Sequence, residues 1–388
     1  MKNQKGVLAI LLTNLFIAFL GIGLVIPVLP TIMNELNISG KVVGYMVAAF
    51  AITQLIVSPF AGSWIDKYGR KIMIVLGLVV FGFSEFLFGY GKTVEVLFIS
   101  RMLGGVSAAF IMPAVTAFIA DITTSETRAK ALGYMSAAIS TGFIIGPGIG
   151  GFLAEFGTRV PFYSAGVLGI LAAVLSQIML REPEHAAAEI PMPGQQTGLR
   201  RIFIPMYLIA FVLIFVLSFG LASFESLFSL FVDHKFGFTP KDIAIIITGS
   251  GIVGAISQVL LFDRLTKKMG EINLIRYSLI VSGLLVLLMT FVSSYFAILL
   301  TTFVLFTGFD LIRPAITSYL SKIAGNEQGF VGGMNSTFTS LGNIFGPIVG
   351  GFLFDIDVDY PYYFAAIVIA IGTVIAFFWK QPKHIFLR

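Results

Sequence analysis

Apolar residues fill this chain in long, nearly uninterrupted runs separated by short polar segments. A run of about 20 residues is long enough to cross the hydrocarbon core of a bilayer as a helix. An outer-membrane barrel would show short alternating segments instead. We therefore predict an all-α integral membrane protein with twelve transmembrane helices. The runs cover residues 7–29, 42–64, 72–91, 94–121, 129–154, 159–180, 203–231, 240–262, 272–292, 295–321, 328–353 and 358–379.

The composition supports this class. Hydrophobic residues make up 57% of the chain and charged residues only 12%, about half the charged share of a soluble domain. The first run lacks a small-residue cleavage site, so we expect it to remain in the mature protein. The chain has no cysteine, and its three histidines lie in predicted loops or the tail. We therefore expect no disulfide, metal site or histidine-based catalytic cluster.

Basic residues follow the expected topology. The side of the membrane that holds the N-terminus carries 18 lysines and arginines, and the opposite side carries 5. Because basic loops stay in the cytoplasm, we predict that both termini are cytoplasmic. The net charge of +5 thus reflects topology rather than nucleic-acid binding.

The chain contains an internal repeat. The segment GFIIGPGIGGFLAE at 142–155 returns as GNIFGPIVGGFLFD at 342–355, and the matches extend over neighbouring runs. Parallel six-helix repeats are typical of secondary transporters, whose substrate sites lie between the halves. The predicted parts are an N-terminal bundle at 1–180, a cytoplasmic linker at 181–202 and a C-terminal bundle at 203–388.

Glycines in the first copy of the repeat share one helix face. Gly142, Gly146 and Gly150 recur every four residues, so another backbone can approach that face closely. Pro147 removes one helical hydrogen bond and is expected to bend the helix, and Gly151 completes the motif. Generic tight packing explains part of this pattern, but its repetition in both halves indicates a conformational role.

A second motif, GSWIDKYGRK, lies between the second and third runs. Gly62 and Gly69 permit tight turns. Asp66 can cap a neighbouring helix or pair with an arginine such as Arg70. An ordinary positively charged hairpin is the alternative interpretation.

Arg101 lies several residues inside the fourth run, where a charge costs at least a few kcal/mol. It either extends toward the outer surface or is buried and tunes a nearby carboxylate. Glu85 lies near the outer end of the third run, and we expect it to face interfacial water.

These motifs resemble the major facilitator superfamily. The loop motif matches with Trp64 and Ile65 as departures, and FISRMLGG matches with Gly104 in place of a common glutamine. GFIIGPGIGGFL matches the fifth-helix antiporter signature in full. Residues 21–30 and 308–317 are further similar to twelve-span drug:proton antiporters, in particular Bmr/NorA-like multidrug efflux proteins of Gram-positive bacteria.

The resemblance implies a multi-pass protein of the bacterial cytoplasmic membrane that exports hydrophobic, often cationic drugs against protons. It also implies a functional monomer with no cofactor, which uses the proton gradient. A symporter or exporter for one metabolite is the nearest alternative, and a channel is a more distant one. An enzyme is not expected, because the sequence shows no nucleophile–base pair.

Acidic residues well inside the predicted spans are the candidates for proton coupling. Burial favours the protonated form of a carboxylate, so protons can bind and leave reversibly. We predict that Glu225 and Asp310 form the coupling pair and that Arg313 and Arg101 tune it. Because Arg313 follows Asp310 by three residues, a static ion pair within one helix is an alternative.

A pocket for bulky cations should be apolar and aromatic with an anion nearby. Phe303 and Phe306 have helical spacing with Asp310 on the tenth span, and Glu225 provides a second anion. Most phenylalanines of such a chain must face lipid or core, which is the alternative for each ring. The remaining predicted pocket residues are Phe16, Gln54 and Phe143.

Overall fold

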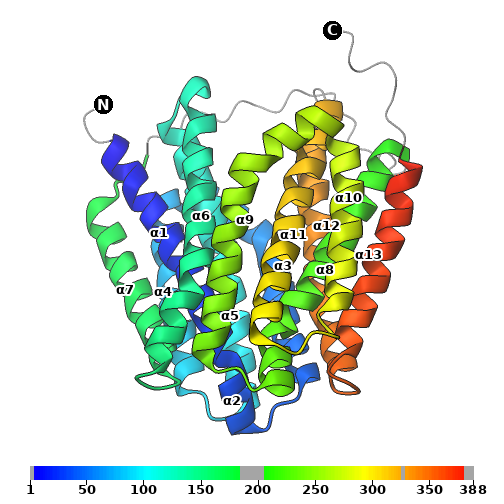
Figure 1. Ribbon diagram of the computed structural model, residues 1–388. Helices are drawn as coiled ribbons and strands as arrows, with labels where there is room; N and C mark the ends of the chain where they lie inside the picture. Colours follow the sequence, from blue (N-terminus) through cyan, green and yellow to red (C-terminus); the bar gives the residue numbers. More distant parts are fainter. Residues whose placement is uncertain (1–3, 184–204, 325–327, 380–388) are drawn as a thin grey trace. The chain divides into compact units, whose positions relative to one another are not determined.

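A computed structural model describes residues 4–183, 205–324 and 328–379. Within these ranges the protein is helical throughout, without strands (Figure 1). The elements are α1 (Gln4–Val25), the 3₁₀ turn η1 (Ile26–Val28), α2 (Leu29–Leu36), α3 (Gly40–Tyr68), α4 (Arg70–Tyr90), α5 (Val94–Ile122), α6 (Ser125–Ala154), α7 (Val160–Met179), α8 (Pro205–Phe236), α9 (Pro240–Met269), α10 (Glu271–Leu288), α11 (Tyr295–Ala324), α12 (Gln328–Phe354) and α13 (Tyr360–Phe378).

The prediction of twelve spans is confirmed, because twelve helical stretches of the described chain are long and apolar enough to cross a membrane. The first of them combines α1, η1 and α2. Several helices extend beyond the apolar runs. α8, for example, continues through Asp233 and Lys235 and stops only before Gly237, which has a φ of +67°. Apolar runs mark the bilayer crossing, whereas turn residues end the helices.

The chain forms two compact units. Unit 1 comprises Met1–Ile38, Met46–Pro191 and Gly237–Thr248, and unit 2 comprises the remainder. The first turns of α9 thus belong to unit 1, and the first turns of α3 belong to unit 2. The predicted domain boundaries remain predictions, since most of the linker at 181–202 lies outside the described residues.

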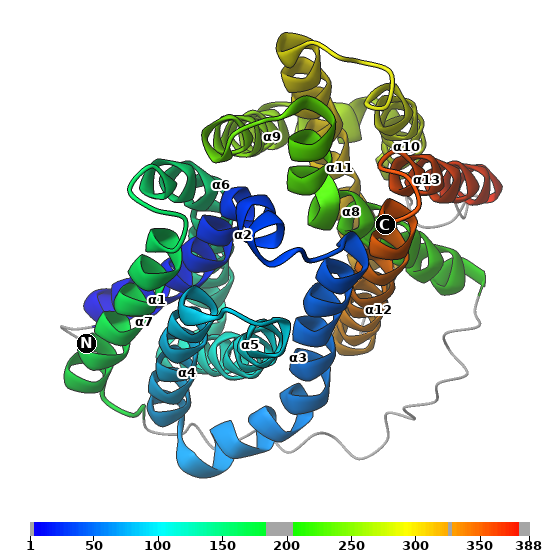
Figure 2. The same cartoon turned by 90° about the horizontal axis from the view of Figure 1, so that it is seen from below.

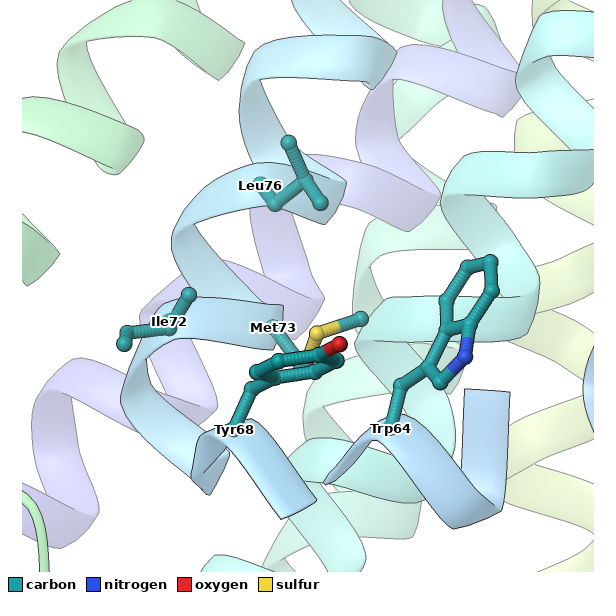
Figure 3. A pocket seen from close by; sticks show the side chains of 5 residues that line it. All are labelled: Trp64, Tyr68, Ile72, Met73 and Leu76. Carbon is teal, nitrogen blue, oxygen red and sulfur yellow. The ribbon is translucent and has the colours of Figure 1, made fainter. Parts of the chain in front are cut away.

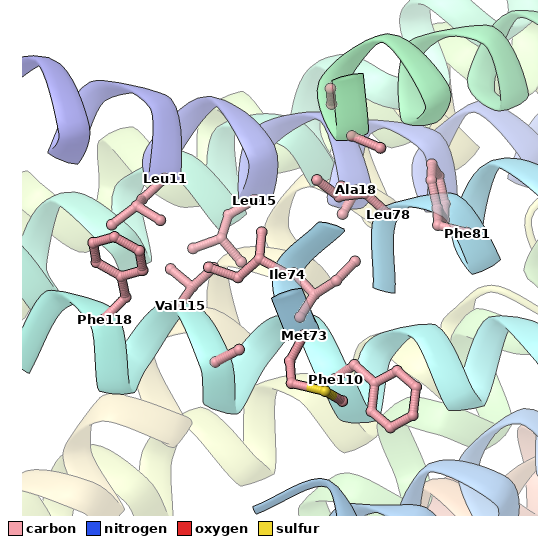
Figure 4. Packing of buried hydrophobic residues seen from close by; sticks show 14 of the residues in the cluster. Leu11, Leu15, Ala18, Met73, Ile74, Leu78, Phe81, Phe110, Val115 and Phe118 are labelled. Carbon is pink, nitrogen blue, oxygen red and sulfur yellow. The ribbon is translucent and has the colours of Figure 1, made fainter. Parts of the chain in front are cut away.

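In unit 1, α1 packs against α6 and α7, and α4 packs against α5 and α7 (Figure 2). Fully buried side chains from α1, α4 and α5 form its core, among them Leu11, Leu15, Leu78, Val115 and Phe118 (Figure 4). In unit 2, α8 packs against α12, and α10 packs against α11 and α13. Since lipid is as apolar as these side chains, close packing rather than water exclusion holds such helices together.

The glycine face predicted for α6 is present and lies against α1. A Cβ atom at Gly146 would stand 2.7 Å from the Leu20 carbonyl oxygen and 2.8 Å from Gly23 Cα. Gly142 and Gly150 approach the backbone of α1 as closely. The same arrangement recurs in unit 2, where the glycines of α12 lie against α8.

Two alanine substitutions in α6 are expected to have opposite effects. Gly146→Ala places a methyl group against the backbone of α1 and should destabilise the protein by about 1–3 kcal/mol. Gly133→Ala meets no atom within 4 Å, so its higher helix propensity should leave stability unchanged or raised by up to ~1 kcal/mol. Thermal unfolding of both purified variants measures this difference. Equal melting temperatures would contradict the tight α1–α6 contact.

Candidate functional site

The two predicted coupling acids lie on neighbouring helices of unit 2. Glu225 is on α8, Asp310 and Arg313 are on α11, and these helices pack together. The charges of Arg313 and Asp310 both act on Glu225, and Arg313 also acts on Asp310. Glu225 and Arg313 are exposed, while Asp310 is half-buried. The structure therefore brings these three groups into one electrostatic cluster.

Asp310 is held by a contact that the sequence did not predict. Its carboxylate lies directly against Gly254 of α9, where a Cβ atom would overlap Oδ2. Among the described residues, neither Asp310 nor Glu225 forms an ion pair within 4 Å. The structure therefore does not contain the Asp310–Arg313 ion pair that the alternative requires. The sequence signal for this contact is Gly254 itself, a glycine in the interior of a long helix.

The predicted aromatic residues of α11 are half-buried and face two different neighbours. The ring of Phe303 lies against Gly249 of α9, one and a half turns from Gly254. The ring of Phe306 makes an edge contact with Phe224 of α8, with centroids 5.8 Å apart. Phe224, whose buried ring makes this contact, directly precedes Glu225 in α8.

Three other predicted pocket residues belong to unit 1. Phe143 of α6 is 41% exposed and packs on Phe19 of α1 with ring centroids 5.3 Å apart. Phe16 and Gln54 are half-buried on α1 and α3. These three residues belong to unit 1, whereas the acids and the α11 rings belong to unit 2. The composition of the predicted pocket remains a prediction.

Arg101 pairs with Glu85 rather than extending away from the protein. Arg101 Nη2 lies 3.1 Å from Glu85 Oε1, and the two side chains are 15% and 3% exposed. The guanidinium also stacks over the Phe88 ring at 4.4 Å. The expectation that Glu85 faces water is wrong, because α5 covers it. Arg101 therefore contacts Glu85, an acid of the same unit.

The motif at 62–71 is almost entirely helical, which corrects the prediction of a loop. α3 continues to Tyr68, and only Gly69 separates it from α4, with a φ of +101°. Gly62 lies inside α3 with open space around it, so no turn requires it. The turn depends on Gly69 alone.

Arg70 connects three parts of unit 1. It lies 3.2 Å from Asp66 of α3 and 2.9 Å from Asp121 of α5. Glu182, just after α7, accepts hydrogen bonds from the backbone N–H groups of Arg70 and Lys71, with the second at 2.9 Å. Because free N–H groups at a helix start favour an anion, Glu182 stabilises the beginning of α4. Sequence reasoning missed Glu182, since it lies more than 100 residues away.

An apolar groove of about 420 Å³ lies where the end of α3 meets the start of α4 (Figure 3). Two turns of α3 and the first turns of α4 line it with Trp64, Tyr68, Ile72, Met73 and Leu76. None of the residues predicted to bind drugs lines it. Its lining matches what a membrane-spanning surface presents to lipid.

The carboxylates that end the repeated motif contact incoming helices. Glu155 pairs with Lys241 at the start of α9, with 2.9 Å between Oε1 and Nζ. Asp355 accepts a hydrogen bond of 3.1 Å from the backbone N–H of Lys41 at the start of α3. Gly151 and Gly351 permit the same two approaches. These acids therefore hold the starts of α9 and α3.

Comparisons with known proteins agree on one family. The family model described as Major Facilitator Superfamily matches residues 11–232 and 210–385. Multidrug resistance protein 1 of Bacillus subtilis (strain 168) is 70% identical over 99% of both chains. Quinolone resistance protein NorA of Staphylococcus aureus is 48% identical over 96% of both chains.

A solved structure shares the fold at low identity. It is a bacterial homologue of the human lysosomal transporter Spinster, in an inward-facing and occupied conformation. The two structures superpose with a TM-score of 0.83 over 98% of this chain and 97% of the other, at 15% identity. No group of three or more acidic, histidine or cysteine side chains suited to a metal ion occurs in the described part of the chain.

Proposed function

Because the chain belongs to the major facilitator superfamily, we propose that it is a proton-coupled antiporter that exports structurally diverse hydrophobic and cationic drugs. The names of its relatives, multidrug resistance protein 1 and quinolone resistance protein NorA, support this substrate class. The family consists of transporters, so the chain is a multi-pass membrane transporter and not an enzyme. The substrates include fluoroquinolones, dyes and quaternary ammonium compounds.

The observation that carries the proposal is the cluster of Glu225, Asp310 and Arg313. A coupling carboxylate must bind either a proton or a cationic substrate, so it must not be held by a permanent ion pair. Among the described residues, no basic side chain lies within 4 Å of either acid. Arg313 instead acts on both acids over a longer distance, which tunes them without neutralising them.

The two acids have different surroundings, which suits two roles. Asp310 is half-buried against Gly254, whereas Glu225 is exposed and directly follows Phe224, whose ring contacts Phe306. Aromatic faces beside an anion attract organic cations. A cation bound there favours loss of the protons, and protonation in turn lowers the affinity for the cation.

Alternating access follows from this competition. The inward-open protein releases protons and binds the drug beside the acids, and the six-helix halves then rock to expose the drug to the outside. Protons from outside displace it. In this proposal both termini face the cytoplasm, as the excess of basic residues on their side indicates, and no cofactor is needed.

Dye export from cells tests the proposed function. Cells that express the protein should lose preloaded ethidium faster than cells without it, and a protonophore should stop this difference. An unchanged difference after collapse of the proton gradient would overturn proton coupling. Equal dye loss with and without the protein would overturn drug export itself.

A further inference from the structure

The two halves place the same backbone features 200 or 201 residues apart. Asn37 follows α2 and Gly237 follows α8, and both have positive φ angles. Gly69 directly precedes α4 and Gly270 directly precedes α10, and both also have positive φ angles. Pro113 and Pro314 lie inside α5 and α11 at the same offset. Corresponding positions in the halves can therefore be compared residue by residue.

One pair of corresponding ion pairs lies where α4 and α10 begin. In unit 1, Arg70 at the start of α4 binds Asp121 at the end of α5, with 2.9 Å between Nε and Oδ2. In unit 2, Glu271 at the start of α10 binds Lys322 at the end of α11. Glu271 and Lys322 lie 201 residues after Arg70 and Asp121, respectively, and each carries the opposite charge.

A second pair lies at the opposite helix ends. In unit 1, Glu35 of α2 lies 3.2 Å from Arg159, directly before α7. In unit 2, Lys235 of α8 lies 2.5 Å from Asp359, directly before α13. These partners are 200 residues later, and their charges are reversed as well.

In each half, the basic residue of this second ion pair also donates hydrogen bonds at the end of one helix. That helix is α4 in unit 1 and the corresponding α10 in unit 2. Arg159 donates to the carbonyl oxygens of Phe88 and Gly91 at the end of α4, at 3.3 and 3.0 Å. Lys235 donates to the carbonyl oxygen of Thr290, just after α10, at 2.7 Å. The two halves thus join the same set of helices with opposite charge patterns.

We propose that this reversal makes each half recognise its own helices during assembly of the duplicated chain. If α4 packed against α11, Arg70 would meet Lys322, and if α10 packed against α5, Glu271 would meet Asp121. At the other end, an exchange of α7 and α13 would bring the acids Glu35 and Asp359 together. Each attractive pair would become a like-charge contact, which discriminates against the wrong partner.

Other features of these helices distinguish the halves poorly. α5 and α11 share an internal proline, and α6 and α12 share the glycine face that receives α1 or α8. Apolar packing between membrane helices depends on small residues at the contact, and these recur in both halves. Charges at the helix ends therefore carry information that the helix surfaces lack.

Two charged contacts of another kind provide a contrast within the molecule. Lys241 pairs with Glu155 inside unit 1, and Asp355 binds the backbone of Lys41 inside unit 2. These contacts join segments of different sequence halves, and their charges have the same sign at corresponding positions. Among the compared contacts of the described residues, the reversal occurs in the pairs that join helices of one half.

A cysteine reporter of wrong pairing tests the proposal in the full-length chain, which has no native cysteine. Ser107 of α5 donates a 2.8 Å hydrogen bond to the Gly77 carbonyl of α4, and Ser278 is the position of α10 that corresponds to Gly77. Both serines are buried in their own units. With Ser107→Cys and Ser278→Cys together, a disulfide forms only where α5 meets α10.

Two charge variants are compared on this background after purification. The first makes unit 2 carry the charges of unit 1 through four substitutions, Lys235→Glu, Glu271→Arg, Lys322→Asp and Asp359→Arg. The second adds the reverse changes in unit 1, Glu35→Lys, Arg70→Glu, Asp121→Lys and Arg159→Asp. In both variants, each of the four compared ion pairs keeps one acidic and one basic partner, but only the second variant restores opposite patterns in the two halves.

The four-substitution variant should form the 107–278 disulfide at least about tenfold more than the parent, within one chain or between chains. The eight-substitution variant should return to the parent level and elute as the parent monomer. Parent-like behaviour of the first variant would overturn the proposal. So would loss of the monomer without the disulfide, or an equal disulfide yield in both variants.

Discussion

Replacing Arg101 by methionine should destabilise the protein by about 3–5 kcal/mol, because it leaves the Glu85 carboxylate buried without its partner. Glu85 is only 3% exposed, and its other oxygen, Oε2, has no hydrogen-bond partner among the described residues. The charge cannot reach water without opening the α4–α5 contact. Thermal unfolding of the purified protein measures the loss.

Removing both charges should restore most of this stability. In Glu85→Leu with Arg101→Met, no buried charge remains, and an apolar replacement of a buried pair is often neutral. Lys267→Met is the matched control, because it breaks an exposed pair with Asp263 and should leave the melting temperature nearly unchanged. A double variant as unstable as the single variant would contradict this interpretation.

The sequence alone predicts the membrane spans, the repeat and the glycine face of α6, because each depends on a local pattern. Long apolar runs require helices in lipid, and glycines every four residues must share a face. Gly142, Gly146 and Gly150 therefore lie where the pattern places them. The depth of Glu225 and Asp310 inside apolar runs makes them candidates, and in the structure they lie on the packed helices α8 and α11. Their role in coupling remains a prediction.

Contacts between distant residues were missed or misjudged. The position of Glu85 near the end of an apolar run predicts that it faces water, but this local pattern does not contain its contact with Arg101 of α5. Glu182 and Gly254 have no special local pattern, and only tertiary packing shows that they contact α4 and Asp310. The polar residues of the motif at 62–71 end an apolar run and so indicate a loop, whereas the helix continues to Tyr68.

Glu225→Gln and Asp310→Asn should each lower the export of cationic drugs at least about tenfold, as expected for loss of a group that acts directly in the transport cycle. Each amide keeps the shape of the side chain but can neither release a proton nor attract a cation. The measurement is the initial rate of ethidium loss from cells with equal amounts of protein in the membrane.

Asp263→Asn provides the matched control for these variants. Asp263 is an acid of unit 2 that is exposed and paired with Lys267, so its loss should leave export near the parent rate. Normal export by both Glu225→Gln and Asp310→Asn would show that the coupling groups lie elsewhere. Loss of export in the control as well would show that the assay reports general damage.

Proton movement driven by drug in sealed vesicles is the most direct test of coupling through these acids. Purified protein is reconstituted with a pH-sensitive dye inside the vesicles, and ethidium is added outside without an imposed pH gradient. We expect drug uptake to change the internal pH in the parent protein, and no change in the combined Glu225→Gln and Asp310→Asn variant. Drug uptake without a pH change in the parent, or an undiminished pH change in the variant, would contradict the proposed mechanism.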